Sequence, residues 1–167
     1  MACDAEAYHQ TDTRRYVAYA APGSMDGGSR DLRVLAYDTA TAQLAWSQTL
    51  DRSEQGTNFL ANFRGSFLVP VPPHLMCAGT MWEGGVQTSC IREAKGEVAW
   101  EGKMPYWSGV LPAYAAKSLA VADLTAIRHI YPFSGVERRY KKLHGTGVRR
   151  ALYAQADDRL YFSPNIE

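Results

Sequence analysis

The chain has 167 residues, of which 46% are hydrophobic and 21% charged, and its 18 basic against 17 acidic side chains give a net charge of +1. These values describe one ordinary globular domain, and they disfavour a general nucleic-acid binder, which needs a basic surplus to contact phosphates. The longest apolar stretch, 66–77, is shorter than the roughly 20 residues that span a bilayer. Ten Tyr, fourteen Gly and eight Pro favour strands joined by tight turns.

The N-terminus carries no secretion signal, because residues 1–10 are acidic and polar and lack a basic start with an apolar core. Two interpretations remain open: the protein is cytoplasmic, or the chain begins after a removed leader. We expect 1–13 to be a flexible N-terminal segment and 14–167 to form a single domain.

Short apolar segments bounded by turn residues predict strands along the whole chain. The predicted strands are 16–21, 32–37, 43–49, 58–63, 66–71, 74–82, 85–92, 97–101, 107–114, 118–123, 126–133, 150–155 and 159–163. Hairpin turns are predicted at 64–65 and 83–84, where glycine allows the chain to reverse. The segments 22–30, 51–57 and 137–150 are predicted to be loops.

One pattern of strand, polar turn and strand ending in an aromatic residue occurs more than once. Residues 36–46 align with residues 90–100 at an offset of 54, and we expect a weaker third copy at 122–131 with Tyr131 in place of tryptophan. In the first copy Asp38 and Thr41 bracket the turn, where their side chains can bond backbone N–H groups.

The first copy resembles the signature of pyrroloquinoline-quinone-type (PQQ-like) β-propeller repeats, A-x-D-x-x-T-G-x-x-x-W. The matching residues are Ala36, Asp38, Thr41 and Trp46. Ala42 stands where the family has glycine. The second copy retains that glycine and the tryptophan as Gly96 and Trp100.

The resemblance implies an all-β fold, a partial or small β-propeller of about three to four antiparallel blades, since a blade takes about 40 to 50 residues. In the family the turn joins the two outer strands of a blade, and the tryptophan packs between neighbouring blades. Three arrangements remain open: a compact four-bladed ring, an open arc completed by another chain, or part of a longer protein. The loops 22–30, 51–57 and 137–150 would meet partners.

The hairpin at 83–84 places Cys77 opposite Cys90, at a position where side chains of paired strands approach most closely. A disulfide between them is geometrically allowed, and the alternative is a pair of small buried thiols in a reducing compartment. A disulfide favours a periplasmic or membrane-anchored extracytoplasmic location over the cytoplasm. The sequence around Cys3 resembles a bacterial lipoprotein junction, with lipidation of Cys3; the alternative is a spare exposed cysteine.

A basic segment at 137–150 has six Lys or Arg against one Glu. Its basic residues are Arg138, Arg139, Lys141, Lys142, Arg149 and Arg150. Such a segment can meet an anionic surface, or it can be a solvated loop between blades. No specific nucleic-acid partner is expected.

No catalytic, cofactor-binding or metal-binding residues are predicted, because the four histidines are scattered and none of the common nucleophile or phosphate-binding motifs is present. By resemblance, quinoprotein dehydrogenases hold quinone and calcium in a complete ring, for which this chain is too short. We therefore expect no cofactor.

The sequence thus predicts a non-enzymatic propeller scaffold or accessory subunit that binds other protein chains in a larger assembly, similar to the propeller of the Gram-negative outer-membrane assembly lipoproteins. The alternative is a small-ligand sensor or a quinoprotein-like oxidoreductase completed by oligomerisation.

Overall fold

The structure is a computed structural model that describes residues 7–22, 30–50, 63–82, 85–105, 112–122, 126–142, 148–154 and 159–164. These residues form strands and turns, and none of them belongs to a helix that could cross a membrane. The strands are β1 (Ala7–Gln10), β2 (Arg14–Pro22), β3 (Arg30–Asp38), β4 (Leu44–Leu50), β5 (Phe63–Val71), β6 (Leu75–Trp82), β7 (Gly85–Arg92), β8 (Val98–Pro105), β9 (Ala113–Ala115), β10 (Ser118–Ala122), β11 (Ala126–Ile130), β12 (Glu137–Lys142), β13 (Val148–Ala154) and β14 (Arg159–Pro164).

Within the described residues the strands form three antiparallel four-stranded sheets and one two-stranded sheet. Each strand pairs with the strand before or after it in the chain, in the orders β1-β2-β3-β4, β5-β6-β7-β8, β9-β10-β11-β12 and β13-β14. We call the four-stranded sheets blades 1, 2 and 3, and the two-stranded sheet the half-blade.

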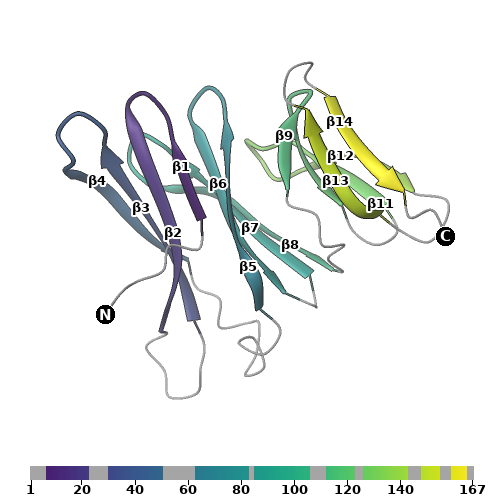
Figure 1. Cartoon of the computed structure of the whole chain (residues 1–167), viewed down its shortest axis with the longest axis horizontal. Helices are drawn as coiled ribbons and strands as arrows, with labels where there is room; N and C mark the ends of the chain where they lie inside the picture. The colour runs from purple at the N-terminus through teal and green to yellow at the C-terminus, as the bar shows by residue number, and fades with distance from the viewer. Residues whose placement is uncertain are drawn as a thin grey trace.

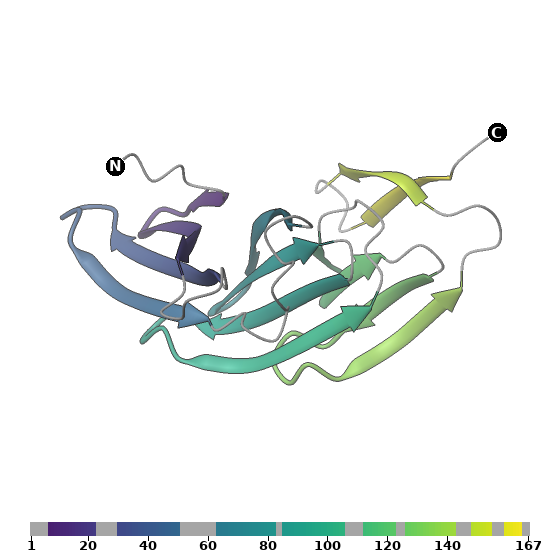
Figure 2. The same cartoon turned by 90° about the horizontal axis from the view of Figure 1, so that it is seen from below.

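The sheets stand side by side in chain order, so that blade 1 lies at one end of the row and the half-blade at the other (Figure 1). The first strands of successive blades contact one another, as β1 contacts β5 and β5 contacts β9. The fourth strands β4, β8 and β12 lie along the opposite side of the row (Figure 2). Blades that share an inner side and fan outwards are the arrangement of a β-propeller, and the described sheets confirm the predicted partial propeller of antiparallel blades.

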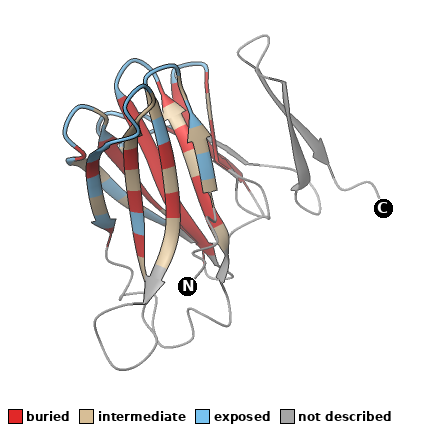
Figure 3. Ribbon diagram, turned by 60° about the vertical axis from the view of Figure 1, so that its left-hand side comes forward, coloured by how far each residue is buried: buried red, intermediate tan, exposed pale blue. Residues whose placement is uncertain are grey.

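Alternation along the central strands builds a core on each side of blade 2 (Figure 3). Between blades 1 and 2 the buried residues are Tyr16, Ala18, Leu32, Val34, Ala36, Trp46, Leu50, Met76, Ala78 and Ile91. Between blades 2 and 3 they are Phe67, Val69, Val71, Leu75, Cys77, Met81, Val86, Cys90, Leu119, Val121 and Ile130. A single blade has no covered face, so each blade depends on its neighbours.

The hairpin at 83–84 has the predicted register, with Trp82 opposite Gly85 and Cys77 opposite Cys90. The predicted hairpin at 64–65 is wrong, because β5 runs through both residues and pairs with β6 along its length. The register shifts between Phe63 and Gly65, where Gly65 has a φ of +135°. This glycine serves a bulge rather than a chain reversal.

Two further segments differ from expectation. The predicted loop 137–150 contains β12 and the start of β13, since an outer strand with two solvent-facing sides can carry charges throughout. The segment 1–13, which was expected to be flexible, contains strand β1, and β1 pairs with β2. The first sheet therefore begins earlier than expected.

Three predicted strands have different limits. The strand expected at 107–114 is observed only as Ala113–Ala115, and 106–111 lie outside the described residues. The strand expected at 126–133 ends at Ile130, where a turn begins. The strand expected at 58–63 lies outside the described residues except for its last residue, and so do the expected loop 51–57 and most of 22–30.

Candidate functional site

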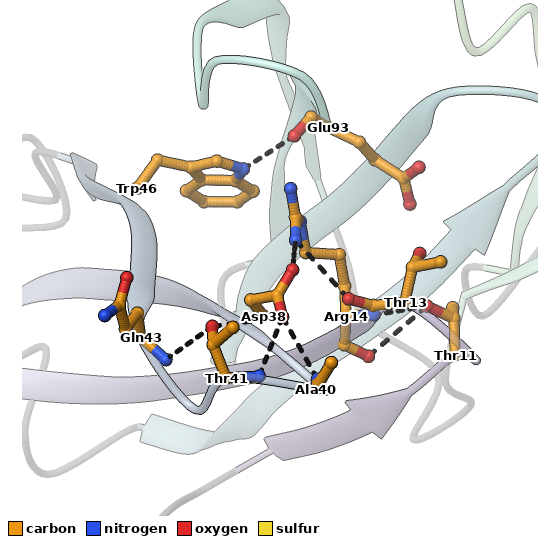
Figure 4. A network of polar contacts seen from close by, with 9 residues as sticks. All are labelled: Thr11, Thr13, Arg14, Asp38, Ala40, Thr41, Gln43, Trp46 and Glu93. Carbon is orange, nitrogen blue, oxygen red and sulfur yellow. Dashed lines mark hydrogen bonds and ion pairs between the residues drawn. The ribbon is translucent and has the colours of Figure 1, made fainter.

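The turn between β3 and β4 is held by the carboxylate of Asp38 (Figure 4). Its Oδ1 accepts hydrogen bonds from the backbone N–H groups of Ala40 and Thr41, at 3.0 and 2.9 Å, and from the Thr41 hydroxyl at 3.1 Å. Its Oδ2 lies 2.6 Å from Nη1 of Arg14 on the neighbouring strand. Donors from Thr41 above all, and then Arg14 and the Ala40 N–H, hold the pKa of Asp38 below its usual value. Asp38 and Thr41 are therefore turn-fixing residues.

The same turn recurs in blades 2 and 3. In each turn the N–H of the first residue donates to the carbonyl oxygen five residues further along the chain. The pairs are Asp38 with Gln43 at 2.9 Å, Arg92 with Glu97 at 2.8 Å and Tyr131 with Val136 at 2.8 Å. The N–H of the fifth residue donates back to the carbonyl of the first. That fifth residue has positive φ in all three, as Ala42 (57°), Gly96 (76°) and Gly135 (72°).

These hydrogen bonds correct the third copy of the repeat, which is centred on 131–136 and not on 122–131. Tyr131 opens the turn, as Asp38 opens the first, and is not the counterpart of Trp46. The counterpart of Trp46 and Trp100, eight residues after the opening residue, is Arg139. The predicted third copy was wrong because it matched Tyr131 to the tryptophan, whereas the third copy has no tryptophan at that position.

Trp46 joins blade 1 to the turn of blade 2. Its indole N–H donates to the carbonyl oxygen of Glu93 at 2.7 Å, and its side chain is 7% exposed. The indole lies over Gly96, where an added Cβ would come within 2.8 Å of the ring. Gly96 is thus required twice, by its positive φ and by the ring against it.

Trp100 makes the same contact one blade further on. Its indole N–H donates to the carbonyl oxygen of Pro132, and an added Cβ at Gly135 would come within 2.9 Å of the ring. Glu93 and Pro132 occupy the same position of their turns, and so do Gly96 and Gly135. We call this contact, an indole stacked on a glycine with its N–H bonded to a turn carbonyl, the tryptophan lock.

A second link between blades 1 and 2 was not foreseen from the sequence. The hydroxyl of buried Tyr16 donates to Glu93 Oε1 at 2.9 Å, and the Tyr16 ring lies 6.0 Å from that of Trp46. Burial, followed by the hydrogen bond to the Glu93 carboxylate, raises the pKa of Tyr16 well above its ordinary value. Glu93 thus receives one bond on its backbone and one on its side chain, both from blade 1.

For Cys77 and Cys90 the sequence left open a disulfide or two buried thiols, and the structure has the disulfide. Cys77 and Cys90 form a disulfide between the adjacent strands β6 and β7, and both are fully buried in the core between blades 2 and 3. Cys3 lies outside the described residues. In the described ranges no three His, Cys, Asp or Glu side chains gather as metal ligands would.

An exposed aromatic cluster lies on the turn of blade 3. Tyr131 and Phe133 are 39% and 40% exposed, with ring centroids 5.4 Å apart, and Val136 on the same turn is 60% exposed. The guanidinium of Arg138 stands 5.2 Å from the centroid of the Tyr131 ring. We call Tyr131, Phe133, Val136 and Arg138 the turn cluster. It was missed because 126–133 was predicted to be a strand.

The remaining residues of the basic segment are placed by backbone only. Arg139, Lys141 and Lys142 belong to β12, Arg149 and Arg150 belong to β13, and their side chains lie outside the described residues. The segment's acidic residue, Glu137, is paired with Arg128 at 2.9 Å.

Three blades with recurring turns and a half-blade define a β-propeller arc. No family model matches the chain, and no curated protein matches it by sequence. Among solved structures it is similar to BamB from Moraxella catarrhalis, with 14% identity and a TM-score of 0.61 over 93% of this chain and 38% of that one. It thus spans well under half the length of BamB.

Two computationally designed proteins are similar as well. Ika8 matches with 13% identity and a TM-score of 0.57, over 90% of this chain and 40% of that one. Ika4 matches with 12% identity and a TM-score of 0.58, over 96% of this chain and 90% of that one. At these identities the likeness shows the fold alone.

Proposed function

We propose that the protein is a non-enzymatic propeller scaffold that holds other protein chains in a larger assembly. The observation that carries the proposal is the turn cluster, an exposed group of apolar and cationic side chains on the turn of blade 3. The likeness of the fold to BamB supports a scaffold, and an extracytoplasmic location would agree with the buried disulfide.

The chemistry of the turn cluster suits a protein partner. Aromatic and arginine side chains contribute most of the binding energy at protein interfaces, because they bury much surface and still make directed contacts. The equivalent turns of blades 1 and 2 carry small or charged residues at 39–42 and 93–96, so the cluster is particular to blade 3. Arg138, held over the Tyr131 ring, would reach an acidic or carbonyl group of the partner.

The proposal is tested by cross-linking the purified chain in an extract of its source organism and identifying the linked proteins by mass spectrometry. The comparison is with a Tyr131→Ala, Phe133→Ala double variant and, as a matched control, Lys95→Ala at an exposed position on the equivalent turn of blade 2. A protein captured by the native chain and the control, and lost with the double variant, is the expected result. Equal capture by all three chains would contradict the proposal.

A further inference from the structure

The turn cluster is fixed by hydrogen bonds of the backbone that carries it. The N–H of Tyr131 donates to the carbonyl oxygen of Val136 at 2.8 Å, and the Tyr131 carbonyl accepts the N–H of Gly135 at 2.8 Å. The carbonyl oxygen of Pro132 accepts the indole N–H of Trp100 from blade 2. A surface whose backbone is fixed before binding loses little conformational entropy when a partner arrives.

The cationic side of the turn cluster has no acidic side chain paired with it in the described part of the chain. Glu137, which follows the turn, forms its ion pair with Arg128 at 2.9 Å. The guanidinium of Arg138 lies over the face of the Tyr131 ring instead. Strand β12 as a whole has the sequence ERRYKK, with four basic residues against this one acid. The charge at the turn is therefore complementary to carboxylates on a partner.

Two hydrogen-bond donors border one aromatic ring of the turn cluster. The Tyr131 hydroxyl lies at the edge of its own ring, and the Arg138 guanidinium stands 5.2 Å from the ring centroid. Neither group has a hydrogen-bond partner among the described residues. A guanidinium binds a carboxylate through two parallel N–H groups, and hydrogen bonds to an ionised acceptor are stronger than neutral ones. The pair of donors therefore suits one carboxylate.

The apolar side of the turn cluster is small. Tyr131, Phe133 and Val136 lie on a single turn, and the two rings meet at an angle of 49° with centroids 5.4 Å apart. A folded partner that docks stably contacts about 20 to 30 residues on each side. The tilted rings offer contact area for one or two apolar side chains, which is the size of contact that a short segment makes.

We propose that the turn cluster binds a short acidic segment of another protein. A carboxylate of the segment reaches Arg138 and the Tyr131 hydroxyl, and a neighbouring apolar side chain covers Tyr131 and Phe133. The inference rests on the proposed scaffold function and states the chemistry of its partner. A lipid surface fits less well, because membrane binding grows with the apolar area inserted, and most of the surface of both aromatic residues is already covered by the chain.

The test is the binding of short fluorescein-labelled peptides to the purified chain, measured by fluorescence anisotropy at low and high salt. Glutamate alternates with leucine in one peptide, and aspartate alternates with phenylalanine in the other. Control peptides have lysine in place of each acid. The native chain should bind at least one acidic peptide, more weakly at high salt, and should not bind the lysine peptides.

Arg138→Glu reverses one exposed charge, and it should weaken binding of the acidic peptide about tenfold or more, because a charged hydrogen bond is lost. The same variant should bind the lysine peptides more tightly than the native chain does. The matched control is Lys95→Glu, the same change of charge at an exposed position on the turn of blade 2, which should bind like the native chain. Tyr131→Ala with Phe133→Ala should abolish binding.

The inference would be overturned if neither acidic peptide bound, if the lysine peptides bound equally well, or if Arg138→Glu and Lys95→Glu lost binding to the same extent. Sedimentation of the native chain with phosphatidylglycerol vesicles, lost with the double variant and without any peptide binding, would overturn it in favour of a lipid surface.

The two proposals fail in different ways. A chain that ignores the peptides, but loses a cross-linked protein with the Tyr131 and Phe133 double variant, contradicts the acidic segment alone. A chain that binds the acidic peptides through Arg138, but captures no protein from the extract, contradicts the scaffold proposal alone.

Discussion

The turn of blade 1 and the turns of blades 2 and 3 share their hydrogen bonds but differ in what lies against them. Gly96 and Gly135 each carry an indole from the preceding blade, whereas Ala42 has a Cβ at the same positive φ, and the two indoles that the structure describes, those of Trp46 and Trp100, lie at the other two turns. The difference teaches that glycine is fixed at this position by the neighbouring blade more than by the turn itself.

Among the variants that test this comparison, the one that removes the indole should lower the free energy of unfolding most. Trp46→Ala leaves a cavity between blades 1 and 2 and deprives the Glu93 carbonyl of its donor, and we expect a loss of about 3 to 5 kcal/mol in the free energy of unfolding. Urea unfolding followed by circular dichroism measures it. An unfolding midpoint equal to that of the native chain would show that the lock does not hold the blades.

Adding a methyl group under the indole should rank second. Gly96→Ala meets both a left-handed backbone, which costs about 1 to 2 kcal/mol, and the ring of Trp46, whose displacement costs about 1 to 3 kcal/mol. The control is Ala42→Gly at the turn of blade 1, which should stay within about 1 kcal/mol of the native chain. Similar effects at both turns would remove the distinction between them.

Blade 2 also differs from blades 1 and 3 in the disulfide between its two central strands. The same cross-strand position holds Tyr16 with Ala36 in blade 1, Cys77 with Cys90 in blade 2 and Ala120 with His129 in blade 3. Replacing both cysteines by alanine should lower the free energy of unfolding by about 2 to 3 kcal/mol, given the short loop they close. The comparison is with the native chain in oxidising buffer, and a stability that does not change would mean that the link adds nothing to the packing.

The smallest effect concerns the Asp38 carboxylate, which blade 1 alone has at the opening of its turn. Because its pKa is lowered in the folded chain, it stabilises the fold above its unfolded pKa, and this stabilisation is lost as the pH falls through the folded value. Asp38→Asn should therefore unfold more easily than the native chain at neutral pH. The gap between their urea midpoints should close in acid, and a gap that does not depend on pH would contradict this role.

The sequence allowed the blades to be predicted because its strands are short and its repeat keeps a polar turn and a tryptophan. It also placed Cys77 opposite Cys90, since a two-residue hairpin loop determines the register. Glu93 and Pro132 could not be identified in this way, because they accept the indole through backbone carbonyls that any residue possesses. The third copy was misplaced for a related reason: Arg139 has replaced the tryptophan, and only the glycine at 135 and the turn hydrogen bonds still mark it.

The turn cluster was missed because Tyr131 and Phe133 continue an apolar segment that reads as a strand. Pro132 between them indicates a turn, because proline cannot donate a hydrogen bond to a neighbouring strand. Strand β12 was not predicted because most of its residues are charged, and an outer strand can expose charged side chains on both sides. Burial depends on the neighbouring blade, and a strand pattern does not contain that information.

The central claim, that the blades are joined by an indole stacked on a turn glycine, is tested most directly by a double-mutant cycle between Trp46 and Gly96. The free energy of unfolding is measured for the native chain, Trp46→Ala, Gly96→Ala and the double variant. The account predicts that Gly96→Ala costs clearly less when Trp46 is absent, with a coupling of about 1 to 3 kcal/mol, because the ring that the methyl group displaces is gone. If the cost of Gly96→Ala is the same with and without Trp46, the lock is not what joins the blades.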